Sequence, residues 1–158
     1  MTIDAFPPAT ITDLAALSPT ATFITLWWIA PGDNGTLGTA AGYVVKYSTS
    51  GPITASNWAT ATTYTQSWTP LSANDIQIET VTGLNPNTTY WFAVEAYDKA
   101  GNYGGVSNSP SGTTTAGSSL LGLNTGTLLM IGGGASVVIA VVLVAVVLSK
   151  RKNPTTNT

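Results

Sequence analysis

The stretch Gly83-Leu-Asn-Pro-Asn-Thr-Thr-Tyr-Trp-Phe-Ala-Val-Glu-Ala-Tyr97 decides the fold of this 158-residue chain. It joins a turn rich in Gly, Pro and Asn to a run of alternating apolar residues. Successive side chains of an extended strand point to opposite faces, so Tyr90, Phe92, Val94 and Ala96 share one face. Because only one face of each sheet in a sandwich is buried, we expect these residues in the core.

The same period of two recurs earlier in the chain, at residues 23–28 and 43–47. Short strands of this kind, separated by turns and without a helical period, are typical of an antiparallel sandwich. The additional core residues that we expect are Ile24, Leu26, Trp28, Tyr43, Val45 and Tyr47. In residues 76–81 the phase changes, because Ile76 and Ile78 share a face that Val81 does not, and a β-bulge would reconcile them.

The stretch 83–96 resembles the signature of fibronectin type III domains, a Gly-Leu-x-Pro turn followed by a tyrosine that starts an alternating strand. Further matches follow the family's order at 9–14, 24–28, 43–47, 98–102 and 106–109, so the resemblance covers residues 7–115. It implies an all-β fold, a seven-stranded immunoglobulin-like sandwich. It also implies a tyrosine corner, in which Tyr90 packs over Leu84 and its hydroxyl bonds to the upstream backbone.

The turn Asp98-Lys-Ala-Gly-Asn102 departs from the best-known adhesive members of that family, which carry Arg-Gly-Asp there. Integrin binding is therefore not implied. The loop 31–41 and the segment 50–74 are long for the family, and long loops are where binding residues concentrate.

A run without charged side chains covers residues 128–148, and Lys150-Arg-Lys152 follows it. About 20 apolar residues at 1.5 Å rise match a hydrocarbon core of about 30 Å. Basic residues mark the cytoplasmic end of a span. We therefore expect a single-pass protein of the cell membrane, with a transmembrane helix over 127–149, an extracellular N-terminal domain and a cytoplasmic C-terminal tail.

The expected organisation follows from this span and the sandwich. The segments are an N-terminal linker at 1–6, the sandwich at 7–115, a stalk at 116–126, the helix at 127–149 and the tail at 150–158. Within the span, Gly132, Ser136 and Ala140 recur at four-residue spacing, which favours a helix-pairing face and a homodimer. The N-terminus does not resemble a signal peptide, so we expect that a leader was removed or, preferably, that further domains precede Met1.

The charge balance and the residue types exclude several kinds of chemistry. Before the span the chain has seven acidic residues and only two basic ones, Lys46 and Lys99, which argues against binding to nucleic acid. Histidine and cysteine are absent, which excludes Ser-His-Asp and Cys-His nucleophile systems and nearly all zinc sites. We expect no enzyme activity, no cofactor and no metal.

Two carboxylate arrangements stand against that expectation. Glu79 and Glu95 could face each other across strands as a glycosidase pair does, although surface carboxylates on a sheet are the commoner case. Asp and Asn at 33–34, or at 98 and 102, could supply oxygens to Ca²⁺, but turn formation explains these residues better.

Aromatic residues provide the candidate interaction surface, for a protein or a glycan partner. Trp27, Trp91 and Tyr97 fall on the outward phase of their strands, whereas Trp58 and Trp68 lie in the long middle segment. Exposed Trp and Tyr mark contact surfaces. The alternative, which we favour, is that this segment packs onto the sandwich and covers Trp27 and Trp91. Asn34 and Asn87 fit the N-glycosylation pattern.

These observations indicate a membrane-anchored extracellular module that serves as a structural spacer or an adhesion domain at the cell surface. One alternative is that the chain anchors a larger exported enzyme, a protease or a glycosidase, encoded upstream. A second alternative is a glycan-binding module that uses the exposed aromatics. Fold is implied much more firmly than function.

Overall fold

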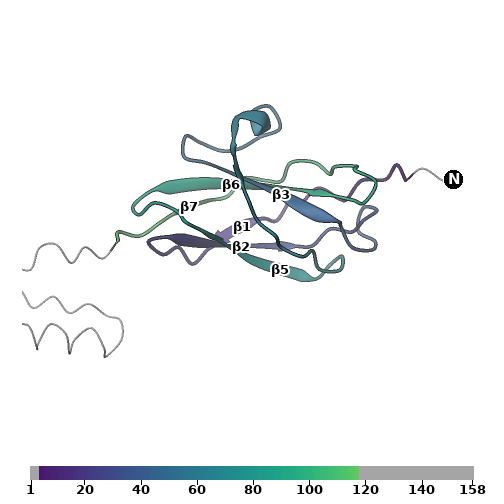
Figure 1. Ribbon diagram of the computed structural model, residues 1–158, viewed down its shortest axis with the longest axis horizontal. Coiled ribbons are helices and arrows are strands. Elements are labelled where there is room, and N and C mark those ends of the chain that lie inside the picture. Colours follow the sequence, from purple (N-terminus) through teal and green to yellow (C-terminus); the bar gives the residue numbers. More distant parts are fainter. Residues whose placement is uncertain (1–3, 118–158) are drawn as a thin grey trace, which may run out of the picture. The chain divides into compact units, whose positions relative to one another are not determined.

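The computed structural model describes residues 4–117, and these form two antiparallel β-sheets packed face to face (Figure 1). Their strands are β1 (Ala15–Leu17), β2 (Phe23–Ile29), β3 (Gly42–Ser48), β4 (Thr62–Tyr64), β5 (Ile76–Thr82), β6 (Thr89–Tyr97) and β7 (Ser111–Thr113). A one-turn 3-10 helix, η1 (Trp58–Thr60), lies between β3 and β4. One sheet has the order β1-β2-β5 and the other β4-β3-β6-β7. The expected all-β sandwich is confirmed.

The predicted membrane anchor lies outside the described residues. This applies to the span 127–149, to the tail 150–158 and to the pairing positions Gly132, Ser136 and Ala140. Within residues 4–117, no helix is both long and apolar enough to cross a bilayer.

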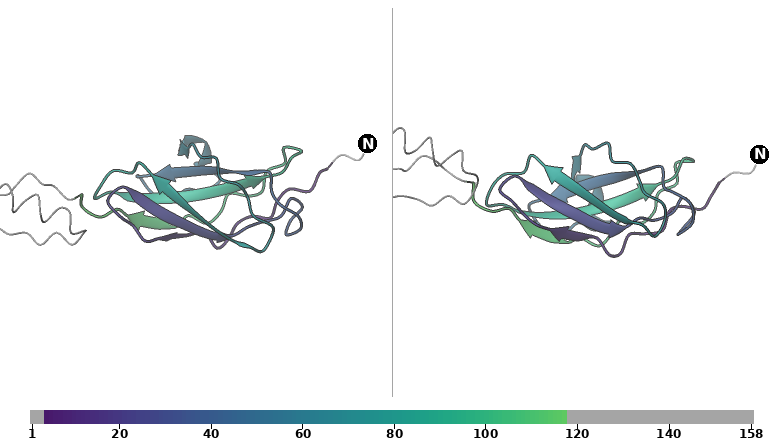
Figure 2. Two further views of the ribbon diagram at one scale, coloured as in Figure 1. Left: turned by 60° about the horizontal axis from the view of Figure 1, so that its bottom comes forward. Right: turned by 90° about the horizontal axis from the view of Figure 1, so that it is seen from below.

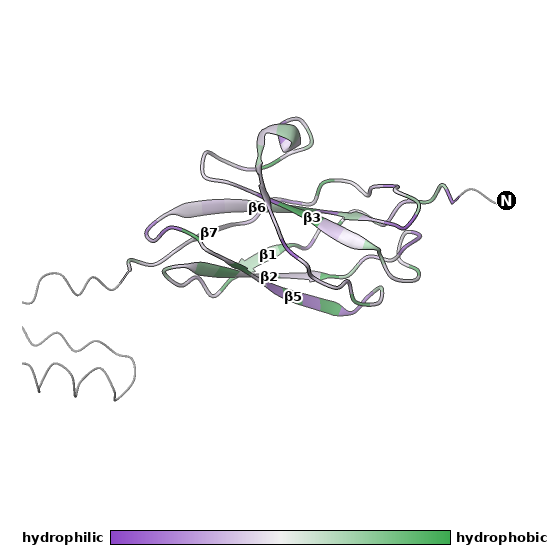
Figure 3. Ribbon diagram, viewed as in Figure 1, coloured by the Kyte–Doolittle hydropathy of each residue, from purple (hydrophilic) through white to green (hydrophobic). Residues whose placement is uncertain are grey.

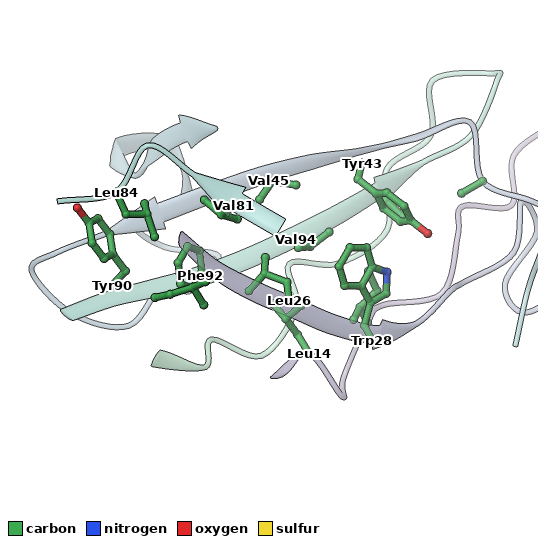
Figure 4. Packing of buried hydrophobic residues seen from close by; sticks show 14 residues of the cluster. Leu14, Leu26, Trp28, Tyr43, Val45, Val81, Leu84, Tyr90, Phe92 and Val94 are labelled. Atoms are coloured by element: carbon green, nitrogen blue, oxygen red, sulfur yellow. The ribbon is translucent and has the colours of Figure 1, made fainter. Parts of the chain in front are cut away.

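The core lies between the two sheets, where their inward side chains meet (Figure 4). Leu26, Trp28, Val45, Phe92 and Val94 are fully buried there. Each comes from the apolar phase of its strand, so the prediction from alternation is confirmed. Tyr47, which we also expected in the core, is only half-buried and packs against the edge of this cluster. Packing of this kind contributes about 1.5–3 kcal/mol for each large apolar side chain that leaves water.

The tyrosine corner is also confirmed. The Tyr90 hydroxyl accepts a hydrogen bond from the Asn85 backbone N–H at 2.9 Å, and Leu84 is buried beside it (Figure 4). The turn needs left-handed backbone at two positions, Gly83 with φ 76° and Asn87 with φ 52°. Gly and Asn are the residues that adopt this conformation at least cost.

The expected β-bulge in β5 is wrong. β5 pairs with β2 in one unbroken register from Phe23 opposite Thr82 to Ile29 opposite Ile76. The inward phase is Gln77, Glu79 and Val81, so Ile76 and Ile78 point outward. Gln77 can be buried because its amide is satisfied: it accepts from the Leu71 N–H at 2.9 Å and donates to Glu79 Oε1 at 2.6 Å.

Residues 49–61, which we call the cover segment, fold over the outer face of the four-stranded sheet (Figure 1). Ile53 in this segment is 2% exposed, and its N–H donates to Ser109 Oγ at 2.9 Å. At the other end of the segment, the Trp58 carbonyl oxygen accepts from Lys46 Nζ, which projects from the outer face of β3. Ala93 lies on the outward phase of β6 and yet is fully buried. Ile53 is the one buried residue of the cover segment, so the segment adds a single buried apolar side chain to the domain.

The crossover from β4 to β5 closes one side of the sandwich. Gln66 Nε2 donates to the Tyr43 carbonyl oxygen at 2.7 Å, which fixes the crossover to β3. The Trp68 ring then packs at 6.2 Å from Trp28 and 5.8 Å from Tyr64, measured between ring centroids. Trp68 thus covers an open side of the core.

Candidate interaction surfaces

The five aromatic residues that the sequence singles out lie on different parts of the molecule. Trp27 is on the outer face of the three-stranded sheet, while Trp91 and Tyr97 are on the outer face of the four-stranded sheet. Trp58 is in η1 and Trp68 in the crossover. All five are half-buried, and among the described residues no ring contact joins any two of them. They do not form one aromatic platform.

Trp58 is held by a contact within the domain. Lys46 Nζ lies 4.9 Å from the centroid of the Trp58 ring and donates to the Trp58 carbonyl oxygen at 2.8 Å. A cation above an aromatic face is attracted by the ring quadrupole. Lys46 therefore fixes the end of the cover segment, and its charge is engaged inside the domain.

An aromatic pair that the sequence analysis missed stands near the turn after β6. Tyr97 and Tyr103 lie 5.6 Å apart between ring centroids, tilted by 39°, and Tyr103 is 54% exposed. The Tyr97 hydroxyl lies directly over Gly42, where a Cβ atom would collide with it. The signal that could have revealed the pair is the tight turn at 98–102, which folds residue 103 back onto residue 97.

The outer face of the three-stranded sheet carries several exposed apolar side chains. Ile76 and Ile78 on β5 are 53% and 58% exposed. Trp27 lies directly opposite Ile78 across the β2–β5 ladder, and Ile29 lies opposite Ile76. Leu17, on β1 at the other side of β2, is also exposed. The cover segment lies over the other sheet and leaves this face open.

The carboxylates do not assemble into a catalytic or metal site. Glu79 is on the inward phase of β5 and Glu95 on the outward phase of β6, so the two belong to different sheets and do not face each other. Burial raises the pKa of Glu95, and the nearby Lys46 charge partly offsets this. Within residues 4–117, no three acidic side chains come together in a way that could hold a metal ion.

Asp98 serves the turn in which it lies. It is buried, and its two carboxylate oxygens accept from the Asn102 N–H at 2.8 Å and from Asn102 Nδ2 at 2.7 Å. Burial alone raises the pKa of Asp98, but the hydrogen bonds from Asn102 and the neighbouring backbone outweigh it and lower the pKa below the ordinary value. The Asp98 and Asn102 side chains are thus occupied with each other.

The two glycosylation motifs lie in turns with exposed asparagines. Asn34 is in a tight hairpin that pairs it with Leu37. With its amide nitrogen turned toward the N-terminal segment, Asn34 donates to Asp4 Oδ1 and to the Phe6 carbonyl oxygen. Asn87 has left-handed backbone in the turn before β6. Modification at either position stays a prediction.

The two antiparallel sheets, their order and the tyrosine corner define an immunoglobulin-like β-sandwich. The family model described as "Fibronectin type III domain" matches residues 7–113, well over half of the chain. The chain belongs to the fibronectin type III family.

The chain is similar to parts of proteins of very different kinds. The chain is 38% identical to chitinase Chi52 of Paenibacillus xylanexedens over 131 residues, which cover 83% of this chain and 21% of the chitinase. It is 49% identical to human calcium-activated chloride channel regulator 1 over 47 residues, 30% of this chain and 5% of that protein. Among solved structures, the fn3 domain of human contactin 1 is 14% identical, with a TM-score of 0.49 over 76% of this chain and 86% of that one. The chain thus spans only a small part of the curated relatives it matches.

Proposed function

We propose that the chain is a non-catalytic spacer or adhesion module, held at the outer cell surface by the anchor predicted over 127–149. One observation carries this proposal. The chain enters the described domain at one end of the sandwich and leaves it at the opposite end, beyond β7 (Figures 1 and 2). A module with its ends so placed adds its full length to whatever it connects.

The internal contacts also support a structural role. The conspicuous polar side chains Gln66, Gln77 and Asp98 are engaged in hydrogen bonds that position the crossover, β5 and the turn after β6. Trp58 and Trp68 are likewise used in packing. The large polar and aromatic side chains thus mainly maintain the shape of the module, which is what a spacer requires.

The topology can be tested with single cysteines, because the chain has none of its own. Thr63→Cys introduces a thiol at an exposed position of β4, and Thr156→Cys introduces one in the predicted tail. We expect a membrane-impermeant maleimide to label Thr63→Cys on intact cells and Thr156→Cys only after lysis. Labelling of Thr156→Cys on intact cells, or failure to label Thr63→Cys, would contradict the proposed orientation.

The spacer role itself needs a replacement experiment. A chain that carries an N-terminal epitope but lacks residues 7–115 should be bound less well by a bulky antibody on intact cells. An unrelated sandwich domain of similar length in place of 7–115 should restore antibody binding. If the native domain restores attachment between cells and the unrelated domain does not, the module is an adhesion domain with a specific partner.

A second candidate function is a module of a larger exported enzyme, and the similarity to chitinase Chi52 favours it. In that case the catalytic residues are elsewhere in the polypeptide, and this domain holds them away from the surface. Sequencing the transcript upstream of Met1 tests this candidate. An open reading frame that continues into a glycosidase domain supports it, and an in-frame stop codon directly upstream contradicts it.

A further inference from the structure

Asn34-Gly35 is the only Asn-Gly pair in the chain, and it lies in the hairpin that pairs Asn34 with Leu37. An asparagine before glycine is chemically labile, because no side chain shields the glycine nitrogen from the asparagine amide. The Gly35 nitrogen forms a bond to Asn34 Cγ, and its proton leaves with the Asn34 NH₂ group as ammonia. Water then opens the succinimide ring to aspartate or isoaspartate. The reaction therefore needs water and no enzyme.

Residues 4–7, which we call the N-terminal strap, are hydrogen-bonded to both reacting groups of this pair. The Gly35 N–H donates to the Pro7 carbonyl oxygen at 3.0 Å. The Asn34 side-chain amide donates to the Phe6 carbonyl oxygen at 3.0 Å and to Asp4 Oδ1 at 3.2 Å. The attacking nitrogen and the leaving group are thus both held by the same short segment.

The hairpin fixes the backbone on either side of the reacting bond. Asn34 and Leu37 exchange two backbone hydrogen bonds, each 3.1 Å long. The Gly35 carbonyl oxygen accepts from the Gly32 N–H at 2.8 Å and from the Ala9 N–H at 3.0 Å. Ring closure needs the Gly35 nitrogen to lose its proton and to approach Asn34 Cγ. A backbone held in this way, with its N–H on an acceptor, resists both changes.

The strap itself is attached at the surface. Its carbonyl oxygen at Asp4 accepts from Asn102 Nδ2 at 3.1 Å, and Phe6 is 73% exposed. Figure 3 shows hydrophilic residues in the two turns that the strap contacts, 31–37 and 98–102. Pro8, the next residue, is buried. Segments with few buried apolar contacts open at low cost while the rest of a domain stays folded. The strap can therefore open up to Pro8 without unfolding the sandwich.

We propose that Asn34 is a site of spontaneous deamidation and that the N-terminal strap controls the reaction. Asn34 is protected while the strap is docked and reacts when the strap is displaced. The product does not take the strap back, because a carboxylate replaces the amide that donated to Phe6 and Asp4. Two carboxylates then face each other with no donor between them. Loss of ammonia makes the change permanent.

Two consequences follow for the domain. The strap lies where the chain enters the sandwich, so a pull on the preceding residues acts on it first (Figure 1). Deamidation also removes the glycosylation motif at 34–36, because a glycan would be attached to the same amide nitrogen. Position 34 thus records in its covalent structure whether the strap has been displaced.

Deletion of residues 2–7 tests the proposal in the otherwise full chain, in detergent micelles and mildly alkaline buffer. Peptide mass spectrometry follows the conversion of Asn34 to aspartate and isoaspartate. The shortened chain should react at least about tenfold faster than the full chain, because the hydrogen bonds to the strap no longer have to break first. Asp4→Ala, which removes one acceptor, should accelerate the reaction less. Asn87, which no glycine follows, is the internal control and should stay unmodified.

Equal rates in the full and the shortened chain would overturn the proposal. It would also fail if the full chain reacted as fast as a synthetic peptide of residues 30–40, which has no strap. Urea unfolding of both variants should remain one cooperative transition, which separates faster deamidation from lost folding. If the shortened chain does not fold, Asp4→Ala alone decides, and an unchanged rate in that variant contradicts protection by the strap.

Hydrogen exchange tests whether the product rejects the strap. Asn34→Asp carries the side chain of the product, whereas Asn34→Ala removes the two donors without adding a charge. The Gly35 N–H, which donates to Pro7, should exchange faster in Asn34→Asp than in Asn34→Ala, and slowest in the wild type. An Asn34→Asp variant that exchanges like the wild type would contradict an irreversible release of the strap.

Discussion

The outer faces of the two sheets both carry apolar residues, but only one face is covered. On the four-stranded sheet, Ala93 is fully buried and the cover segment contributes the buried Ile53. On the three-stranded sheet, Ile76 and Ile78 remain more than half exposed beside Trp27. The difference teaches that the outer face of a sheet with the same alternation can be partly covered or left open, depending on where a long loop lies.

The largest expected difference between the two faces is in the cost of removing an isoleucine. Ile53→Ala should lower the free energy of unfolding by about 2–4 kcal/mol, because it leaves a cavity at a buried position. Ile78→Ala, on the open face, should cost less than about 1 kcal/mol, because most of the side chain is already in water. Urea unfolding monitored by tryptophan fluorescence measures both. Equal costs would mean that the cover segment contributes no real packing.

The attachment of the cover segment should have the next largest effect. Ser109→Ala removes the acceptor of the Ile53 N–H and leaves this donor without a partner, which should cost about 1–2 kcal/mol. Ser56→Ala is the matched control, because the Ser56 hydroxyl bonds only to the exposed Thr54 side chain. Thermal unfolding of both variants makes the comparison. A Ser56→Ala variant that is the less stable of the two would contradict the role of Ser109 in attaching the cover segment.

Lys46 should contribute less, because it is only half-buried. Lys46→Met keeps the length of the side chain but removes its hydrogen bond and its contact with the Trp58 ring, at an expected cost of about 0.5–1 kcal/mol. Lys99→Met, at the exposed turn after β6, should be neutral. If the two variants lose the same stability, the Lys46–Trp58 contact has no specific effect.

The smallest expected effect is a pH dependence on the covered face. Burial raises the folded-state pKa of Glu95, so protonation of this side chain favours the folded state. This contribution to stability is fully present below the ordinary pKa of 4.5 and is lost as the pH rises through the folded-state pKa. Glu95→Gln should therefore be the more stable chain at neutral pH by a few tenths of a kcal/mol, and the gap should close toward pH 4. In a Lys46→Met background the gap should widen, because Lys46 lowers this pKa. A gap that is unchanged with pH would contradict the burial of Glu95.

The central strands could be predicted from the sequence because strict alternation leaves one interpretation of each face. Tyr90 illustrates this, since the preceding Gly-Leu-x-Pro turn and the following apolar alternation together place its ring and its hydroxyl. Trp28 and Phe92 follow from alternation alone. The anchor at 127–149 rests on composition in the same way and stays a prediction.

The loops and β5 could not be predicted because their positions depend on partners that are distant in sequence. Trp68 has no periodic neighbours, and only the crossover brings it against Trp28. The outward direction of Ile78 depends on Gln77, whose buried amide is satisfied by the backbone of the crossover. A rule that places isoleucine inside and glutamine outside gives the wrong face, and the expected bulge was a consequence of that rule.

The points at which the chain enters and leaves the described domain have a mechanical consequence. At one end of the described domain, the Ala9 N–H donates to the Gly35 carbonyl oxygen and the Gly35 N–H donates to the Pro7 carbonyl oxygen. At the other end, β7 is paired with β6. Tension applied to the two ends acts nearly parallel to the strands. The ladder hydrogen bonds at each end are then loaded together in shear, instead of being peeled apart one at a time. The resistance of the domain to a pulling force is then set by the rate at which whole strands separate, which is an unfolding rate, and not by the equilibrium free energy of unfolding.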